Sequence, residues 1–151
     1  MAGIEDGDGA GHADARASFF GAYAFRSQSC PLGRFPAGRG LRIYFAGDSA
    51  YAPHFREVRL RLGPIDLALI PIGAYEPRWF MGAVHMNPAE AVQAHLDLGA
   101  PKSIGMHFGT FQLTNEGIDE PLRALDEARR ANQIPEDRFS TLTPGESFSV
   151  R

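Results

Sequence analysis

The sequence has little cysteine, no excess of either charge and no long apolar run. Its single cysteine, Cys30, has no partner for an internal disulfide, and its net charge is only −3. That charge provides no broad basic surface for phosphate backbones or anionic lipid, so nucleic acid is not an expected partner. No apolar run approaches the ~20 residues that cross a bilayer, and residues 1–17 lack the apolar core of a secretory signal. These absences indicate a cytoplasmic protein without a transmembrane segment.

What remains is the composition of one globular domain. The chain has 151 residues, of which 44% are hydrophobic and 22% charged, which is typical of a soluble domain that buries roughly 70% of its unfolded surface. Residues 1–17 are the exception, because four glycines and four acidic residues leave little to bury. We therefore expect a disordered tail at 1–17 and one folded unit at 18–151.

The order of the expected elements is that of an α/β fold. Residues 18–27 alternate loosely between apolar and polar side chains, and a segment rich in proline and glycine connects them, as in a long hairpin, to a second apolar run at 41–45. From there short apolar runs alternate with helical patterns, which indicates β-α-β units around a largely parallel sheet. We expect helices at about 53–62, 88–98 and 118–132, strands at 65–73 (central) and 102–106, and a final turn and edge strand within 141–150.

The helix at 88–98 has the clearest boundaries. Asn87 is a favourable capping residue, Pro88 suits the first helical position, and Glu90 follows the cap by three residues, as in a capping box. Gly99 comes just past the last apolar residue and is expected to end the helix.

Three strand ends deliver residues of the kind that bind metals. Asp48 follows the strand that begins at 41, His85 lies in the loop 71–87 after the central strand, and His107 follows the strand 102–106. In an open parallel sheet, side chains from several elements converge beyond the carboxyl ends of the strands. Carboxylate oxygen and neutral imidazole nitrogen both bind divalent metals. The coincidence of the three residues predicts a metal site.

Each of these residues also has a structural interpretation. An aspartate after glycine often caps a helix or forms a turn, and His107 could be a buried, hydrogen-bonded histidine. The loop 71–87 is long enough to be functional; it either packs through its own aromatic side chains or presents them to a substrate. His54 and His95 fall within expected helices, where we interpret them as surface or partly buried residues and leave them out of the site.

Four segments carry a resemblance to a known family: YFAGDSAYAPHF (44–55), GPIDLALIPIGAYEPRWFM (63–81), HMNPAEAV (85–92) and MHFGTFQLTNE (106–116). From about Ile43 onward the chain resembles the N-acylphosphatidylethanolamine-hydrolysing phospholipase D group of the metallo-β-lactamase superfamily. The resemblance implies an α/β fold that is the C-terminal half of an αββα sandwich, with a mixed sheet and helices packed on one face.

The resemblance also implies a chemistry. Superfamily members hold a binuclear site, usually zinc, in which Asp48 would bridge the two metals, His107 would be a terminal ligand, and His85 would reach the substrate phosphate or leaving group. A metal-bound hydroxide would then cleave a phosphodiester or related ester, because the cations lower the pKa of water and neutralise charge on the phosphate oxygens.

One departure limits what this chain can hold alone. The superfamily motif H-x-H-x-D-H, which supplies most of the metal ligands, does not occur in these 151 residues. His12 is a faint candidate for a further ligand in a shortened segment. Because two or three protein ligands do not build the usual binuclear cage, we expect at most partial zinc binding here and leave open whether the chain alone is an enzyme.

The absent half suggests two further expectations. The sheet face that would pack against it would be exposed and apolar, which predicts a homodimer or association with a separately encoded N-terminal half.

The alternative to a metal-dependent hydrolase is a non-catalytic α/β remnant or partner-binding module that has lost the metal site. A nucleotide-binding domain is disfavoured, since neither G-x-G-x-x-G nor G-x-x-x-x-G-K-[ST] follows a strand.

Overall fold

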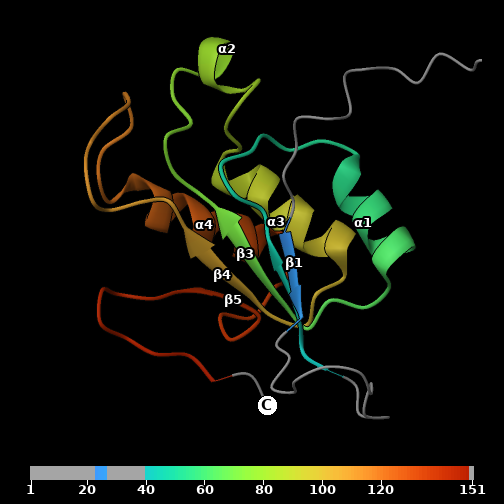
Figure 1. The fold of residues 1–151 in the computed structure, drawn as a ribbon. Coiled ribbons are helices and arrows are strands. Elements are labelled where there is room, and N and C mark those ends of the chain that lie inside the picture. The colour runs from blue at the N-terminus through green and yellow to red at the C-terminus, as the bar shows by residue number, and fades with distance from the viewer. Residues whose placement is uncertain (1–22, 27–39, 150–151) are drawn as a thin grey trace, which may run out of the picture.

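The computed structural model describes residues 23–26 and 40–149, which form one five-stranded sheet with helices. The strands lie in the order β1-β2-β3-β4-β5 (Figure 1). β1 is antiparallel to β2 and the other three neighbouring pairs are parallel, so the sheet is mixed and the strand at its centre is β3, as predicted. The bounds are β1 Tyr23–Arg26, β2 Arg42–Phe45, β3 Leu67–Pro71, β4 Ser103–Met106 and β5 Phe139–Thr141.

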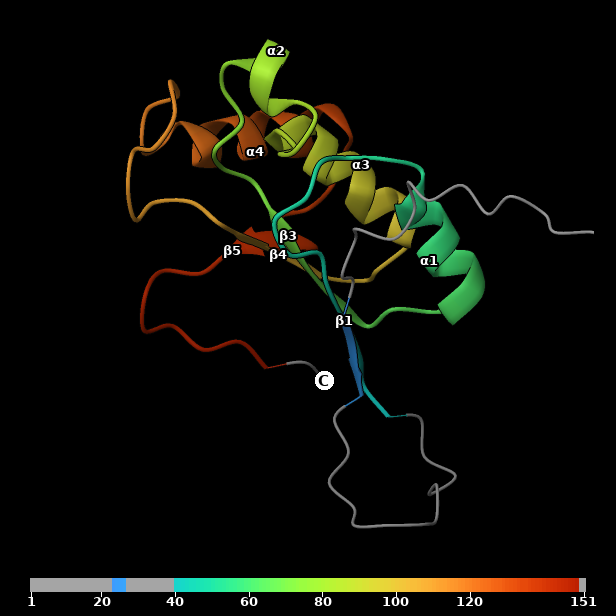
Figure 2. The same cartoon turned by 45° about the horizontal axis from the view of Figure 1, so that its top comes forward.

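The three longer helices cover one face of this sheet. Figures 1 and 2 show α1, α3 and α4 on the same side of the strands, which agrees with the expected half of a sandwich. The short helix α2 stands apart, beyond the carboxyl ends of β3 and β4 (Figure 1). The bounds are α1 His54–Leu62, α2 Arg78–Met81, α3 Pro88–Leu98 and α4 Glu120–Ala131.

The core lies between the sheet and these helices. A row of paired residues crosses the sheet on the helical side, and each member is almost fully buried: Tyr44, Ala68, Ser103 and Phe139. The ring of Phe55 from α1 lies edge-on to Tyr44 at 6.0 Å between centroids. This packing fixes the direction of the strands and therefore the position of the loops that follow them.

The opposite face of the sheet is only partly covered. Phe45 is 38% exposed and its partner across the ladder, Leu69, is half-buried, whereas Leu67 and Ile104 on the same face are buried. The alternation along β2 and β3 explains the difference between the two faces, because successive side chains in a strand point to opposite sides.

The predicted boundaries of α3 are confirmed. Asn87 Oδ1 accepts a hydrogen bond from Glu90 N at 2.8 Å, and Glu90 Oε2 accepts one from Asn87 N at 2.9 Å, which completes a capping box. Gly99 ends the helix in the left-handed conformation, with φ at 59°. This conformation costs glycine little because it has no Cβ.

The prediction for the C-terminal segment is wrong. An edge strand was expected after a turn within 141–150, but β5 precedes that turn, and residues 142–149 contain no strand. The reason is Phe139, whose fully buried side chain anchors β5 beside β4. Thr143 N donates to Glu146 Oε2 at 2.7 Å, so the following residues form a turn.

Several expectations fall on residues that the structure does not describe. These are the disordered tail 1–17 with His12, Cys30, and the connection between β1 and β2. The strand expected at 18–27 is observed over residues 23–26, and its remaining residues lie outside the described part. Within the described ranges, no helix has the length and apolar character to span a bilayer.

Candidate metal centre

The three predicted site residues lie beyond the carboxyl ends of the parallel strands. Asp48 follows β2, His107 follows β4, and His85 lies in the long loop after β3. Gly47, with φ at 65°, turns the chain after β2 and presents Asp48. His107 follows β4 directly and itself adopts a left-handed conformation, with φ at 62°. His85 lies between α2 and α3. The parallel arrangement of β2, β3 and β4 therefore delivers all three side chains to one edge.

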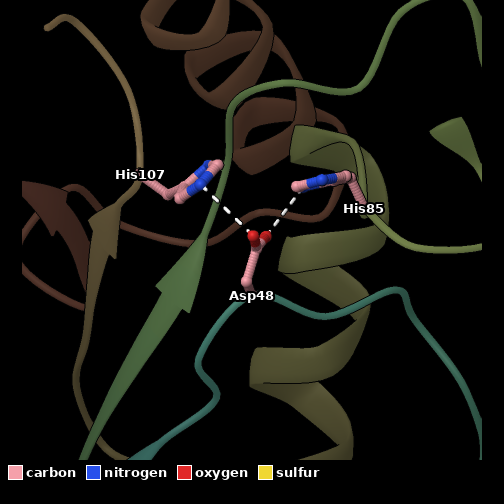
Figure 3. Close-up of side chains that lie close together, drawn as sticks. All are labelled: Asp48, His85 and His107. Atoms are coloured by element: carbon pink, nitrogen blue, oxygen red, sulfur yellow. Dashed lines mark ion pairs between the residues drawn. The ribbon is translucent and has the colours of Figure 1, made fainter.

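The structure brings these three side chains together (Figure 3). His85 Nδ1 lies 2.8 Å from Asp48 Oδ1, and His107 Nε2 lies 3.6 Å from Asp48 Oδ2. The two imidazole rings are 5.3 Å apart between centroids. One ligand atom from each residue falls within 4.8 Å of the other two, so a single cation can contact all three.

The donor set fits a metal better than it fits an ordinary ion pair. His85 Nδ1 is buried and makes no hydrogen bond of acceptable geometry, although Asp48 Oδ1 is only 2.8 Å away. A buried polar atom without a hydrogen bond needs another partner. Two imidazole nitrogens and one carboxylate are a ligand set suited to zinc, and three protein ligands leave positions open for water, substrate or further ligands.

The structure does not support a helix-capping role for Asp48 or a buried position for His107, although Asp48 does lie in a bend after β2. Asp48 does not cap α1, whose N-cap residue is Pro53 and which has no side-chain capping bond. The His107 side chain is 35% exposed, so it is not a buried core histidine, and the Asp48 side chain is 57% exposed. The site therefore opens to solvent, while His85, at 15%, forms its more enclosed side.

Backbone contacts fix the loops that carry the site. Met86 N donates to Ser49 O at 3.2 Å, which ties the residue after His85 to the residue after Asp48. Gly73 lies against His107 so closely that a Cβ added to Gly73 would be 2.2 Å from the carbonyl oxygen of His107. Only glycine permits this approach of the loops after β3 and β4.

Arg78 holds the loop around His85, and the sequence did not single it out. Its Nη1 donates to His85 O at 3.0 Å and to Tyr75 O at 3.2 Å. Its Nη2 lies 2.8 and 2.9 Å from the two oxygens of Glu90. The available signal was an arginine directly before the apolar run 79–81, three residues after Tyr75 and twelve before the capping glutamate. Arg78 thus connects the loop to the first turn of α3.

Glu116 holds the other end of the same loop and was also missed. Its carboxylate accepts hydrogen bonds from Tyr75 N at 3.1 Å and Glu76 N at 3.0 Å, and the residue is only 6% exposed. Burial acts to raise the pKa of Glu116, but the hydrogen bonds from the Thr114 side chain and from backbone N–H groups outweigh it and hold that pKa below its ordinary value. Glu116 is therefore charged at neutral pH.

A pocket of about 280 Å³ adjoins His107. Its walls come from Gly73 and Ala74 on one side and from the segment 107–118 on the other. Most of the larger side chains that line it are apolar: Phe108, Phe111, Leu113 and Ile118. The metal-type ligands thus lie beside a space suited to an apolar group.

His54 and His95 do not belong to the site. His54 begins α1, with its ring 4.0 Å from that of Phe55 between centroids. His95 is 3% exposed, more deeply buried than expected, and its Nδ1 lies 2.7 Å from Ser103 Oγ. Burial, reinforced by the nearby charge of Arg138, lowers the pKa of His95 to about 4, so it stays neutral in the core.

Comparisons with known proteins found similar sequences. The sequence profile described as "Beta-lactamase superfamily domain" matches residues 10–108. N-acyl-phosphatidylethanolamine-hydrolyzing phospholipase D 1 of Caenorhabditis elegans is 45% identical over 75% of this chain, which covers 33% of that protein. A UPF0173 metal-dependent hydrolase of Methanoculleus marisnigri is 33% identical over 74% of this chain and 43% of its own length.

The fold has neighbours among solved structures. The metallo-beta-lactamase fold protein YhfI from Bacillus subtilis is 21% identical, with a TM-score of 0.51, over 72% of this chain and 40% of that protein. The chain therefore spans less than half the length of each of these three proteins.

Proposed function

The chain belongs to the family of the beta-lactamase superfamily domain, in the group related to N-acylphosphatidylethanolamine-hydrolysing phospholipase D, and from this premise we propose that it contributes to a zinc-dependent phosphodiesterase. The broad functional class of the chain is that of the metallo-β-lactamase superfamily hydrolases. The proposed substrate is a lipid phosphodiester or a related ester. The observation that carries the proposal is the convergence of Asp48, His85 and His107 within 4.8 Å.

Each residue has a proposed role. Asp48 and His107 would hold the zinc, with Asp48 as the ligand shared between the ions and His107 as a terminal ligand. When bound, the metal supplies an activated water and neutralises charge on the phosphate. His85 turns Nδ1 toward Asp48, so Nε2, on the other side of the ring, is available to donate a proton to a phosphate oxygen or to the leaving group.

The proposal includes a partner, because Asp48 and His107 alone do not complete a binuclear site. We propose that an N-terminal half of the superfamily fold supplies the remaining ligands, with another copy of this chain as the alternative source. The partly exposed sheet face around Phe45 supports this, since an apolar side chain on a sheet face is stabilised by burial against a partner. The second candidate function is a partner-binding module without catalytic activity. The exposure of Phe45 favours this function equally.

Metal content and hydrolysis separate the two functions. The purified chain is loaded with zinc, dialysed and analysed for bound metal, then assayed on a chromogenic phosphodiester. The proposal predicts at least one retained zinc per chain, lost in Asp48→Ala and in His107→Ala. Asp137→Ala, which removes an exposed carboxylate distant from the site in sequence, is the control. A folded chain that retains no zinc in any variant supports the non-catalytic module.

A further inference from the structure

A buried carboxylate in the last turn of α3 joins three segments of the chain. The Asp97 side chain is only 5% exposed. Its Oδ2 accepts a hydrogen bond from Tyr51 Oη at 2.7 Å, and its Oδ1 accepts bonds from Arg56 Nε at 2.9 Å and Gln93 Nε2 at 3.0 Å. Residue 51 lies in the loop between β2 and α1, residue 56 on α1 and residue 93 on α3. The carboxylate therefore ties that loop to two helices.

Asp97 is charged at neutral pH. Burial acts to raise the pKa of its carboxyl, but the three hydrogen bonds outweigh burial and hold that pKa below its ordinary value. A hydrogen bond to a charged acceptor is stronger than one between neutral groups. The bond from the Tyr51 hydroxyl is therefore a strong restraint on the loop between β2 and α1.

The loop that contains Tyr51 also carries Asp48, three residues earlier. Residues 46–53 form no helix or strand, so the contacts that hold this loop decide where the Asp48 carboxylate lies. A backbone hydrogen bond to β3 fixes the start of the loop. Tyr51 fixes its end, because the hydroxyl binds Asp97 and the ring stacks on Phe55 with 6.0 Å between centroids.

The other end of α3 is close to the residue that faces Asp48. His85 lies three residues before α3 begins, and Met86 N donates to Ser49 O at 3.2 Å. Figure 3 shows the side chains of Asp48 and His85 turned toward each other from separate segments. An α-helix is a rigid element of fixed length. Its first turn thus fixes the chain after His85, and its last turn, through Asp97, fixes the chain after Asp48.

We propose that Asp97 is a positioning residue of the metal centre. Through Tyr51 it holds the Asp48 loop at its present spacing from His85, and this role rests on the proposed zinc-dependent function. Asp97 is not among the three ligand-type residues. A purely stabilising role predicts a loss of folding stability alone. A positioning role also predicts weaker zinc binding by the folded chain, because residues that orient ligands contribute to metal affinity.

The chain offers matched variants at this one carboxylate. Tyr51→Phe removes only the hydroxyl that binds Asp97 and retains the ring that stacks on Phe55. Arg56→Ala removes another donor to Asp97, one that is 67% exposed and lies on α1, outside the loop. Zinc affinity, measured by isothermal titration, should fall about tenfold in Tyr51→Phe and in Asp97→Asn and stay unchanged in Arg56→Ala.

The double variant Tyr51→Phe/Asp97→Asn tests whether the two residues act as a unit. If Asp97 acts through Tyr51, the double variant should lose no more zinc affinity than the weaker of the two single variants. Losses that multiply would show that the two residues act independently and would overturn the proposal. Circular dichroism should show that every variant is folded.

A measurement without metal separates this inference from the proposed function. Amide hydrogen exchange at Met86, followed by NMR in the metal-free chain, reports the contact with Ser49 O. We expect about tenfold faster exchange in Tyr51→Phe and no change in Arg56→Ala. The amide of Ala91, bonded within α3, is the internal reference and should be unaffected. If the natural chain binds no zinc, the proposed function fails, while the exchange of Met86 still decides the positioning role.

Three results would overturn the positioning role. The first is exchange at Met86 that is unchanged in Tyr51→Phe, or accelerated equally in Arg56→Ala. The second is equal acceleration at Met86 and Ala91, which would indicate general destabilisation. The third is a natural chain that binds zinc and a Tyr51→Phe variant that binds it with the same affinity.

Discussion

Gly73 and His107 approach so closely that a side chain at residue 73 would overlap the backbone of residue 107. A Cβ built on Gly73 lies 2.2 Å from His107 O and 3.3 Å from His107 C. His107 in turn has a left-handed φ of 62°, so its backbone conformation is already unusual. The absence of one methyl group thus permits the loop after β3 to lie against the residue that presents its ring to Asp48.

Gly73→Ala is therefore expected to destabilise the fold and displace His107. Overpacking of this kind costs about 1–3 kcal/mol, measurable by urea unfolding, and zinc affinity should fall in the same variant. Gly40→Ala is the matched control, because nothing lies within 4 Å of a Cβ at that position. Equal stability and zinc affinity in Gly73→Ala and the natural chain would contradict the role assigned to this contact.

The parts of this fold that sequence predicts well depend on local patterns. The limits of α3 follow from Asn87, Pro88, Glu90 and Gly99, because each acts through backbone conformation or a hydrogen bond within a few residues. The convergence of Asp48 with the two histidines also follows, since parallel strands bring their ends to the same edge.

The parts that sequence does not predict depend on distant contacts. Glu116 bonds to backbone groups 40 and 41 residues away, and no local pattern encodes that pairing. The edge strand was misplaced because the burial of Phe139 against α3 and β4 decides where pairing occurs. The aromatic loop was expected either to pack through its rings or to present them; Tyr75 is buried while Trp79 is exposed.

Arg78→Ala is expected to loosen the loop that carries His85. The substitution removes two ionic hydrogen bonds to Glu90 and two bonds to carbonyl oxygens, in a site where both side chains are about two-thirds buried. We expect a loss on the order of 2 kcal/mol in the free energy of unfolding.

Arg61→Ala is the comparison for this prediction. It removes an exposed pair with Glu57, whose partners are 78% and 57% exposed, and should cost only about 0.3–0.5 kcal/mol. Thermal or urea denaturation measures both variants. Equal losses would show that the Arg78 network contributes no more than a surface ion pair.

His95 should make the fold sensitive to moderate acid. Its pKa is lowered by burial from 6.5 to about 4 in the folded state, so the unfolded chain binds more protons between those values. The free energy of unfolding is therefore not reduced by His95 above about pH 6.5. It falls as the pH drops toward 4, by on the order of 3 kcal/mol in total.

His95→Gln removes this titration while retaining a polar group near Ser103. Urea unfolding at several pH values should give a flatter profile for this variant than for the natural chain between pH 6.5 and 4.5. The comparison uses the difference between the two profiles, because buried carboxylates such as Glu116 also lose their charge at lower pH. Parallel profiles would contradict the assignment to His95.

His85→Ala should separate substrate chemistry from metal binding. If His85 donates a proton through Nε2, its removal lowers hydrolysis of the chromogenic phosphodiester by about a hundredfold or more, while bound zinc stays near its original amount. Metal analysis and kinetics on the same preparation measure both. Complete loss of zinc in this variant would instead make His85 a metal ligand, as its 2.8 Å approach to Asp48 would also allow.

The central claim is that Asp48 and His107 bind zinc at the edge of the sheet where His85 lies beside them. Isothermal titration of the metal-free chain with zinc, compared between the natural sequence and Asp48→Ala, tests it most directly. The account predicts at least one saturable zinc site per chain that Asp48→Ala abolishes while its circular dichroism spectrum is retained. Zinc binding that is absent from the natural chain, or unchanged by Asp48→Ala, would contradict it.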